Sequence, residues 1–190
     1  MRKPVDAPAA RGESAAMSAP PPRFAALLLA AGAARRFGAE TAKQFLPIAG
    51  QPVLRHAPCA LLTEGAMLQP VGDPAAIANA LAGLDFLPPV AGGATRQDSV
   101  RAGLEALAAH APEIVLMHDG ARPLIPAGTV QALLQALRSH PGAIPAVPVA
   151  DTLKRGQDGR IAATVPRENL FRAQTPQAFH FPLLLALHRD

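Results

Sequence analysis

The stretch FAALLLA, residues 24–30, followed by Ala31 and Gly32, decides the fold class of this chain. The run is short, almost wholly apolar and preceded by prolines, so it predicts a buried strand. Two cations, Arg36 and Lys43, come next in the sequence. Small side chains and fixed cations at the end of a strand suit a polyphosphate, because the backbone can approach the ligand closely. Taken alone, this loop also fits an ordinary turn with two solvated cations.

Composition indicates one globular domain. The chain has 190 residues, of which 49% are hydrophobic and 17% charged, and its net charge is +4. This length is sufficient for a proper core, and no apolar run approaches the roughly 20 residues of a membrane helix. Because Trp and Tyr are absent and the arginines are scattered, we expect a small anionic substrate, with neither a nucleic acid nor a membrane as partner.

The beginning of the chain and its cysteine predict little function. Residues 1–22 are rich in Pro, Ala and Ser without a continuous apolar segment, so we expect a disordered tail there. Cys59 is the only cysteine, so no internal disulfide is possible. Its apolar neighbours predict a buried structural thiol, and a reducing, cytoplasmic setting is expected.

Apolar patterning alternates between strand-like and helix-like segments after residue 30. Strands are expected at 24–30, 67–71, 86–90, 114–117, 143–149 and 161–165. Helices are expected at 52–64, at 73–81, after a cap at Thr95 or Asp98, around 130–137 and at 182–188. This alternation predicts an α/β fold with a mainly parallel sheet. In such sheets, ligands bind at the carboxyl ends of the strands.

Two further motifs follow expected strands. In Gly92–Val100, the paired glycines permit positive φ and a close backbone approach, and Ser99 could contact a base edge. A turn followed by a helix cap explains the same residues. In His118–Pro123, Asp119 could hold Mg²⁺ or a ribose hydroxyl, and Arg122 could bind a phosphate. The alternative for this pair is a surface salt bridge in a turn.

The last constellation lies in an irregular stretch near the end of the chain. It comprises Asp151–Lys154, Thr164–Arg167 and Arg172–Phe179, and it supplies cations and hydroxyls among turns and short strands. This pattern suits either a substrate-binding arm or an oligomer contact, and by itself it decides neither.

In combination, these motifs resemble the 2-C-methyl-D-erythritol 4-phosphate cytidylyltransferase family of the non-mevalonate isoprenoid pathway. The family's Ala-Ala-Gly-x-Gly-x-Arg and Lys-Gln correspond to residues 30–44, and its Gly-Gly-x-x-Arg-x-x-Ser-Val to 92–100. Its His-Asp-x-Ala-Arg-Pro corresponds to 118–123. Its Asp-Thr-x-Lys and Gln-Thr-Pro-Gln-x-Phe correspond to 151–154 and 174–179. The resemblance covers residues 24–185 and is greatest to the cytidylyltransferase half of the bifunctional form.

The resemblance implies a three-layer Rossmann-like nucleotidyltransferase fold with a protruding arm around residues 150–176. It implies cytidylyl transfer from CTP to 2-C-methyl-D-erythritol 4-phosphate, with Mg²⁺ as cofactor, by a homodimer joined through the arm. The implied catalytic residues are Arg36, Lys43 and Arg167. The implied nucleotide-binding residues are Ala30, Ala31, Gly32, Gly93, Ser99 and Asp119, the last also a metal ligand. The implied acceptor-binding residues are Asp119, Arg122, Thr152, Arg167 and Thr175, with Arg167 and Thr175 reaching across the dimer.

The chain departs from the family pattern in two ways. Ala34, Ala42 and Gly120 replace residues usual in the motifs, and these changes are mild. The family also continues past residue 190 with a late Asn-x-Lys motif. Residues 23–190 therefore resemble a nucleotidyltransferase domain without its C-terminal segment. Two alternatives stay open: another nucleotidyltransferase, of molybdopterin or sugar-phosphate type, and an inactive CTP-binding fragment.

Overall fold

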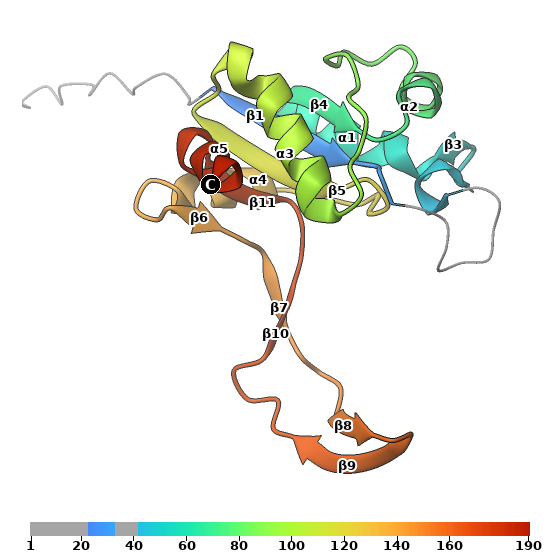
Figure 1. Cartoon of the computed structure of the whole chain (residues 1–190), viewed down its shortest axis with the longest axis vertical. Helices are drawn as coiled ribbons and strands as arrows, with labels where there is room; N and C mark the ends of the chain where they lie inside the picture. The colour runs from blue at the N-terminus through green and yellow to red at the C-terminus, as the bar shows by residue number, and fades with distance from the viewer. Residues whose placement is uncertain (1–22, 33–41) are drawn as a thin grey trace, which may run out of the picture.

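The computed structural model describes residues 23–32 and 42–190. The expected tail at 1–22 and the cation Arg36 lie outside the described residues. Within these residues, the centre of the fold is a five-stranded sheet of order β4-β1-β5-β11-β6 (Figure 1). Its strands are β1 (Phe24–Leu29), β4 (Met67–Val71), β5 (Ile114–Asp119), β6 (Gly142–Ala143) and β11 (Gln177–His180). β1 pairs in parallel with β4 and β5, whereas β11 runs antiparallel to β5 and β6.

Helices cover both faces of this sheet, because β1 is apolar at consecutive positions. The helices are α1 (Val53–Thr63), α2 (Pro74–Ala80), α3 (Arg96–Leu107), α4 (Thr129–Ala136) and α5 (Phe181–Arg189). Ala26 and Leu28 of β1 belong to a buried cluster with side chains of α1, α2 and α4. Ala25 and Leu27 belong to a second cluster with side chains of α3 and α5. The expected three-layer α/β fold is therefore confirmed, as is the buried strand.

The strand register brings three carboxyl ends to one edge of the sheet. Leu29 is paired with Val71 on one side and with Asp119 on the other. Beyond this point, the Ala30 N–H donates to the Val71 carbonyl over 2.7 Å, and the Gly120 N–H donates to the Leu29 carbonyl over 2.8 Å. A Cβ on Gly120 would lie 2.5 Å from Cδ1 of Leu54, so the packing explains glycine there.

The start of α3 is fixed by a capping box. Thr95 is the N-cap and its hydroxyl accepts from the Asp98 N–H, while the Asp98 carboxylate accepts from the Thr95 N–H. Both residues expected as caps therefore act together, and two otherwise unpaired backbone donors are satisfied. The capping box sets where the helix begins relative to the sheet edge.

A long arm leaves the sheet after β6 and returns before β11. Its near part pairs β7 (Ala146–Pro148) with β10 (Phe171–Ala173), and its far part pairs β8 (Leu153–Gln157) with β9 (Arg160–Val165). Figure 1 shows that the arm projects away from the three layers. The remaining short elements are a hairpin of β2 (Pro47–Ile48) and β3 (Gln51–Pro52), and the 3-10 helices η2 (Lys43–Phe45) and η3 (Ala108–His110).

Two expected strands differ in the structure because prolines interrupt them. Residues 86–90 lie beside β4 but form only an isolated bridge between Val71 and Val90, since Pro88 and Pro89 lack the N–H groups a ladder needs. Residues 143–149 divide at Pro145. The part before this proline joins the main sheet, and the part after it joins the arm.

Cys59 is exposed, so the predicted buried thiol is wrong. The buried positions of α1 include Leu54, Ala57 and Leu61, which follow helical spacing along one face, and Cys59 lies on another face. Across the two described stretches of the chain, no helix has both the length and the hydropathy required to cross a membrane.

Candidate active site

Two loops of small residues touch at the sheet edge. The first loop is Ala30–Gly32, directly after β1, and the second loop is 91–95, before α3. A Cβ on Gly92 would lie 2.2 Å from the Cβ of Ala31, and a Cβ on Gly93 would lie 2.2 Å from the Cβ of Asp98. Neither glycine has a positive φ, so of the two properties that glycine permits, only the close backbone approach is used. Glycine is needed at both positions for space, not for backbone conformation.

Ser99 holds the second loop in place. Its side chain is buried, its Oγ accepts from the Gly93 N–H over 3.0 Å, and its hydroxyl donates to the Thr95 carbonyl over 3.0 Å. The hydroxyl is thus engaged with the backbone of its own loop. A direct contact of Ser99 with a base remains a prediction.

Gln44, the residue after Lys43, is hydrogen-bonded to the backbone of the first loop. The Gln44 side chain is 5% exposed, and its Nε2 donates to the Ala30 carbonyl over 2.7 Å and to the Gly32 carbonyl over 3.3 Å. Lys43 precedes it in η2, with an exposed side chain. Gln44 was not among the expected site residues, although it belongs to the Lys-Gln pair of the first motif. The partner cation Arg36 lies outside the described residues.

Asp119, at the end of β5, lies between two arginines. Its Oδ1 is 3.2 Å from Nη2 of Arg96, and its Oδ2 is 3.3 Å from Nε of Arg122. Nη1 of Arg122 also donates to Oε1 of Gln174 over 2.6 Å. Two guanidinium groups around one carboxylate leave an excess of positive charge, which favours an anionic ligand. Arg96 was not among the expected site residues, although it lies within the second motif.

A metal ion would find one carboxylate at this edge. In residues 23–32 and 42–190, no group of three or more His, Cys, Asp or Glu side chains could hold a metal. Mg²⁺ is commonly bound by one or two carboxylates together with substrate phosphates. Asp119 does not fit a metal held by protein ligands alone. It fits Mg²⁺ that arrives with a polyphosphate if the metal displaces Arg96 or Arg122 from one carboxylate oxygen.

His118 and Thr175 lie next to this cluster and contact each other. The His118 side chain is fully buried, its Nε2 is 2.9 Å from the Arg122 carbonyl oxygen, and its Nδ1 is 3.2 Å from Oγ1 of Thr175. The Asp119 N–H donates to the same Oγ1 over 3.4 Å. Burial lowers the pKa of His118, which favours the neutral ring. Thr175 therefore lies in the site of its own chain, so its expected reach across a dimer is wrong.

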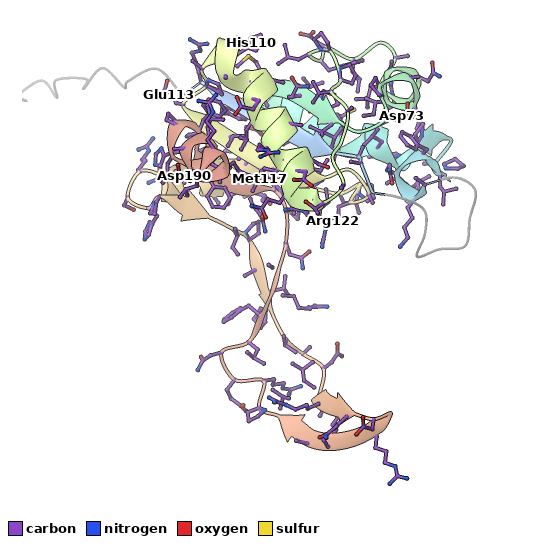
Figure 2. The ribbon with its side chains drawn as sticks, viewed as in Figure 1. Asp73, His110, Glu113, Met117, Arg122 and Asp190 are labelled. Carbon is purple, nitrogen blue, oxygen red and sulfur yellow. The ribbon has the colours of Figure 1, made fainter. Side chains whose placement is uncertain are left out.

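The structure does not bring Thr152 and Arg167 to this edge. Thr152 directly precedes β8, and Arg167 follows β9 and donates to the Ala150 carbonyl within the arm. Figure 1 shows β8 and β9 far from the sheet. Figure 2 shows Arg122 at the other end of the arm, beside the beginning of α3. The arm residues thus cannot meet Asp119 of the same chain in this arrangement.

The other expected residues gather at one edge of the sheet. The first loop, the second loop with Ser99, the cluster of Asp119 and Arg122, and Thr175 all lie where β1 and β5 end. Together with Arg96, these residues form an anion site in which small residues lie beside two guanidinium groups that share one carboxylate.

Comparisons with known proteins identify the family of this chain. Residues 24–190 match the family model described as IspD: 2-C-methyl-D-erythritol 4-phosphate cytidylyltransferase. The bifunctional enzyme IspD/IspF of Granulibacter bethesdensis is 60% identical over 168 residues, which are 88% of this chain and 45% of that relative. The 2-C-methyl-D-erythritol 4-phosphate cytidylyltransferase of Cereibacter sphaeroides is 47% identical over 171 residues, 87% of this chain and 76% of the relative.

Solved structures give the same result. The 2-C-methyl-D-erythritol 4-phosphate cytidylyltransferase from Thermus thermophilus has a TM-score of 0.68 at 32% identity, covering 88% of this chain and 75% of that chain. The bifunctional IspDF from Campylobacter jejuni has a TM-score of 0.72 at 26% identity, covering 88% of this chain and 43% of that chain. This chain spans less than half the length of the bifunctional relatives that it matches. From the match over residues 24–190, the chain belongs to the IspD family, 2-C-methyl-D-erythritol 4-phosphate cytidylyltransferase.

Proposed function

We propose that this chain transfers the cytidylyl group of CTP to 2-C-methyl-D-erythritol 4-phosphate, forming 4-diphosphocytidyl-2-C-methyl-D-erythritol and pyrophosphate. The observation that carries the proposal is the contact between the two small-residue loops, beside the Asp119–Arg122 pair, at one edge of the sheet. Ligands bind at the carboxyl ends of the strands in such sheets, and this edge places cations suited to phosphates there. The family membership supports the choice of acceptor and nucleotide.

On the nucleotide side, backbone and cations act together. The backbone of the first loop and of Gly93 lets CTP approach closely, and Ser99 holds Gly93 in position. Lys43, next to the buried Gln44, and Arg36 would neutralise the triphosphate and stabilise the charge that develops during transfer. These roles require no covalent bond to the protein.

On the acceptor side, Arg122 would bind the phosphate of methylerythritol phosphate, and Thr175 and Asp119 would contact the rest of the molecule. Arg122 is suited to this because its guanidinium is oriented by both Asp119 and Gln174. A side chain that is already held in place loses less entropy when the ligand binds.

The reaction is an in-line displacement. An oxygen of the acceptor phosphate attacks the α-phosphorus of CTP, the bond from the α-phosphorus to the oxygen bridging to the β-phosphate breaks, and pyrophosphate leaves with that electron pair. Because two anions must approach each other, the fixed cations lower the barrier by offsetting their repulsion. When bound, Mg²⁺ supplies further charge neutralisation on the triphosphate, and Asp119 would hold it.

We further propose a homodimer in which the arm completes the partner's site. The arm carries exposed apolar side chains, among them Ile161 at 70% and Phe171 at 59% exposure, which a second copy would cover. Thr152 and Arg167 would then reach the acceptor in the other subunit. We also propose a cytoplasmic location, since one cysteine permits no internal disulfide and CTP is an intracellular nucleotide.

Pyrophosphate release tests the activity. The chain is incubated with Mg²⁺, methylerythritol phosphate and each of CTP, GTP and ATP in turn. In the presence of the acceptor, we expect pyrophosphate release with CTP but not with GTP or ATP. We expect no release when the acceptor is omitted. A preference for GTP or ATP would favour another nucleotidyltransferase, and CTP binding by calorimetry without release would favour an inactive fragment.

Mixing two inactive variants tests the shared site. Asp119→Asn damages the sheet edge and Arg167→Ala damages the arm, so each variant alone should be inactive. Half of the randomly mixed dimers contain one of each, and each mixed dimer has one intact site, so about a quarter of wild-type activity should return. No recovery in a mixture that sediments as a dimer would contradict the proposed role of Arg167.

A further inference from the structure

We propose that His118 is a positioning residue that joins Arg122 and Thr175 into one acceptor-binding unit. This proposal rests on the proposed function, in which Arg122 and Thr175 bind the acceptor. His118 was not among the residues expected from the sequence to act in the site. It contacts both of them from the end of β5, and its side chain has no exposure to solvent.

The hydrogen-bond partners fix which ring nitrogen carries the proton. Nε2 lies 2.9 Å from the Arg122 carbonyl oxygen, which can only accept, so Nε2 must donate. When the ring is neutral, Nδ1 is then an acceptor, and the Thr175 hydroxyl donates a hydrogen bond to it over 3.2 Å. Oγ1 of Thr175 in turn accepts from the Asp119 N–H over 3.4 Å. The result is one directed chain of hydrogen bonds across β5 and the segment before β11.

A second connection runs parallel to this chain. Nη1 of Arg122 donates to Oε1 of Gln174 over 2.6 Å, so the side chain of Arg122 is attached to the residue before Thr175. His118 attaches the backbone of Arg122 to Thr175 itself. The turn 119–122 and the pair 174–175 are therefore fastened at two points, although they lie more than 50 residues apart in the sequence.

This arrangement predicts an effect on one substrate only. In the described part of the loops proposed to bind CTP, the hydrogen bonds run to Gln44, Ser99, Asp98 and the Val71 carbonyl, and none runs to His118. Removing the imidazole should therefore loosen the acceptor side and leave the nucleotide side in place. A role of His118 in core packing alone would lower stability without separating the two substrates.

Three variants separate the two hydrogen bonds. His118→Phe keeps a ring of similar size and loses both, His118→Asn retains an acceptor near Thr175, and His118→Gln retains a donor near the Arg122 carbonyl. We expect His118→Phe to raise the KM for methylerythritol phosphate about tenfold, with the KM for CTP unchanged, because about one net hydrogen bond of binding free energy is lost. Asn and Gln should each restore part of the loss.

Leu116→Val is the matched control. Leu116 is fully buried on the same face of β5, two residues before His118, and has no polar contact with the acceptor residues. Its variant should lower the melting temperature without changing the ratio of the two KM values. Equal changes of both KM values in His118→Phe would overturn the positioning role.

The ring tautomer can be measured without substrate. ¹⁵N NMR of the unliganded protein should show a proton on Nε2 of His118, and a ring protonated on Nδ1 alone would overturn the inference. This readout also distinguishes two failures. A wild-type chain without turnover would refute the proposed function, whereas a wild-type chain with turnover and a wrong tautomer would refute only the role of His118.

Discussion

Replacing Gly92 by alanine should separate the two loops that form the proposed nucleotide site. The added Cβ would lie 2.2 Å from the Cβ of Ala31 and 3.2 Å from Oγ of Ser99. Two carbon atoms in contact prefer a separation of about 3.5–4.0 Å. One loop must therefore move by more than about 1 Å relative to the other. Because both contacts are to short side chains, no flexible group can yield instead.

The size of the effect follows from this displacement. A misplacement of about 1 Å in a site can cost about 100-fold in rate. We therefore expect kcat/KM for CTP to fall about 100-fold, which corresponds to about 2.7 kcal/mol of transition-state stabilisation. The fold itself should lose only about 1–3 kcal/mol, as is usual for overpacking.

The assay is pyrophosphate release at varied CTP, with CTP binding measured by calorimetry and unfolding followed by circular dichroism. Gly156→Ala is the control, since its added Cβ would meet its nearest neighbour, the Arg160 carbonyl oxygen, at 3.8 Å. This control makes the same chemical change in the arm without a clash. It should keep the wild-type affinity for CTP.

An unchanged KM and an unchanged dissociation constant for CTP in Gly92→Ala would contradict this prediction. That outcome would mean either that the loops tolerate the movement or that CTP does not bind between them. A crystal structure of the variant with CTP bound would tell these apart, because it would show whether CTP lies between the displaced loops.

Three further changes test other parts of the structure. Ser99→Ala leaves the Gly93 N–H without its acceptor and should lower stability by about 1–3 kcal/mol in urea unfolding while weakening CTP binding; an unaffected CTP affinity would argue against its loop-holding role. Leu104→Ala, at a fully buried position of α3, should cost about 2–5 kcal/mol with kcat of the folded enzyme retained, and a loss below about 1 kcal/mol would contradict the packing described. Hydrogen bonds from Thr95 hold the pKa of Asp98 below its ordinary value, so its contribution is present above the unfolded-state pKa and is lost as the pH falls through the folded-state pKa. Asp98→Asn should therefore lose less stability than the wild type between about pH 5 and about pH 2, and parallel melting curves for the two proteins would refute this.

Local patterns determined the elements whose formation depends on neighbouring residues. The apolar run 24–30 predicted β1, because a short run of consecutive apolar residues bounded by Pro and Gly is typical of a strand covered on both faces. Thr95 and Asp98 predicted the start of α3, because both hydrogen bonds of a capping box are local. The expected strand at 86–90 was wrong. The prediction rested on the apolar composition of this segment, but Pro88 and Pro89 lack the backbone N–H groups that strand pairing needs.

The candidate site was predicted in part for the same reason. The small-residue loops and Asp119 follow strands directly, so their gathering at one sheet edge follows from parallel pairing. The hydrogen bond of the buried Ser99 to Gly93 and that of Gln44 to Ala30 could not be predicted, because they depend on contacts that only tertiary packing creates. The exposure of Cys59 likewise depends on which face of α1 meets the sheet.

By itself, the sequence determined the α/β class, the buried first strand and the order of the motifs. The tertiary structure alone decided which distant residues meet. Gln177 of β11 pairs with Met117 of β5, and this antiparallel register places Thr175 beside the end of β5, in contact with His118. It also decided that Thr152 and Arg167 lie out on the arm (Figure 1). The physical reason is that burial and capping act over a few residues, whereas strand pairing and packing join residues whose separation leaves no periodic signal in the sequence.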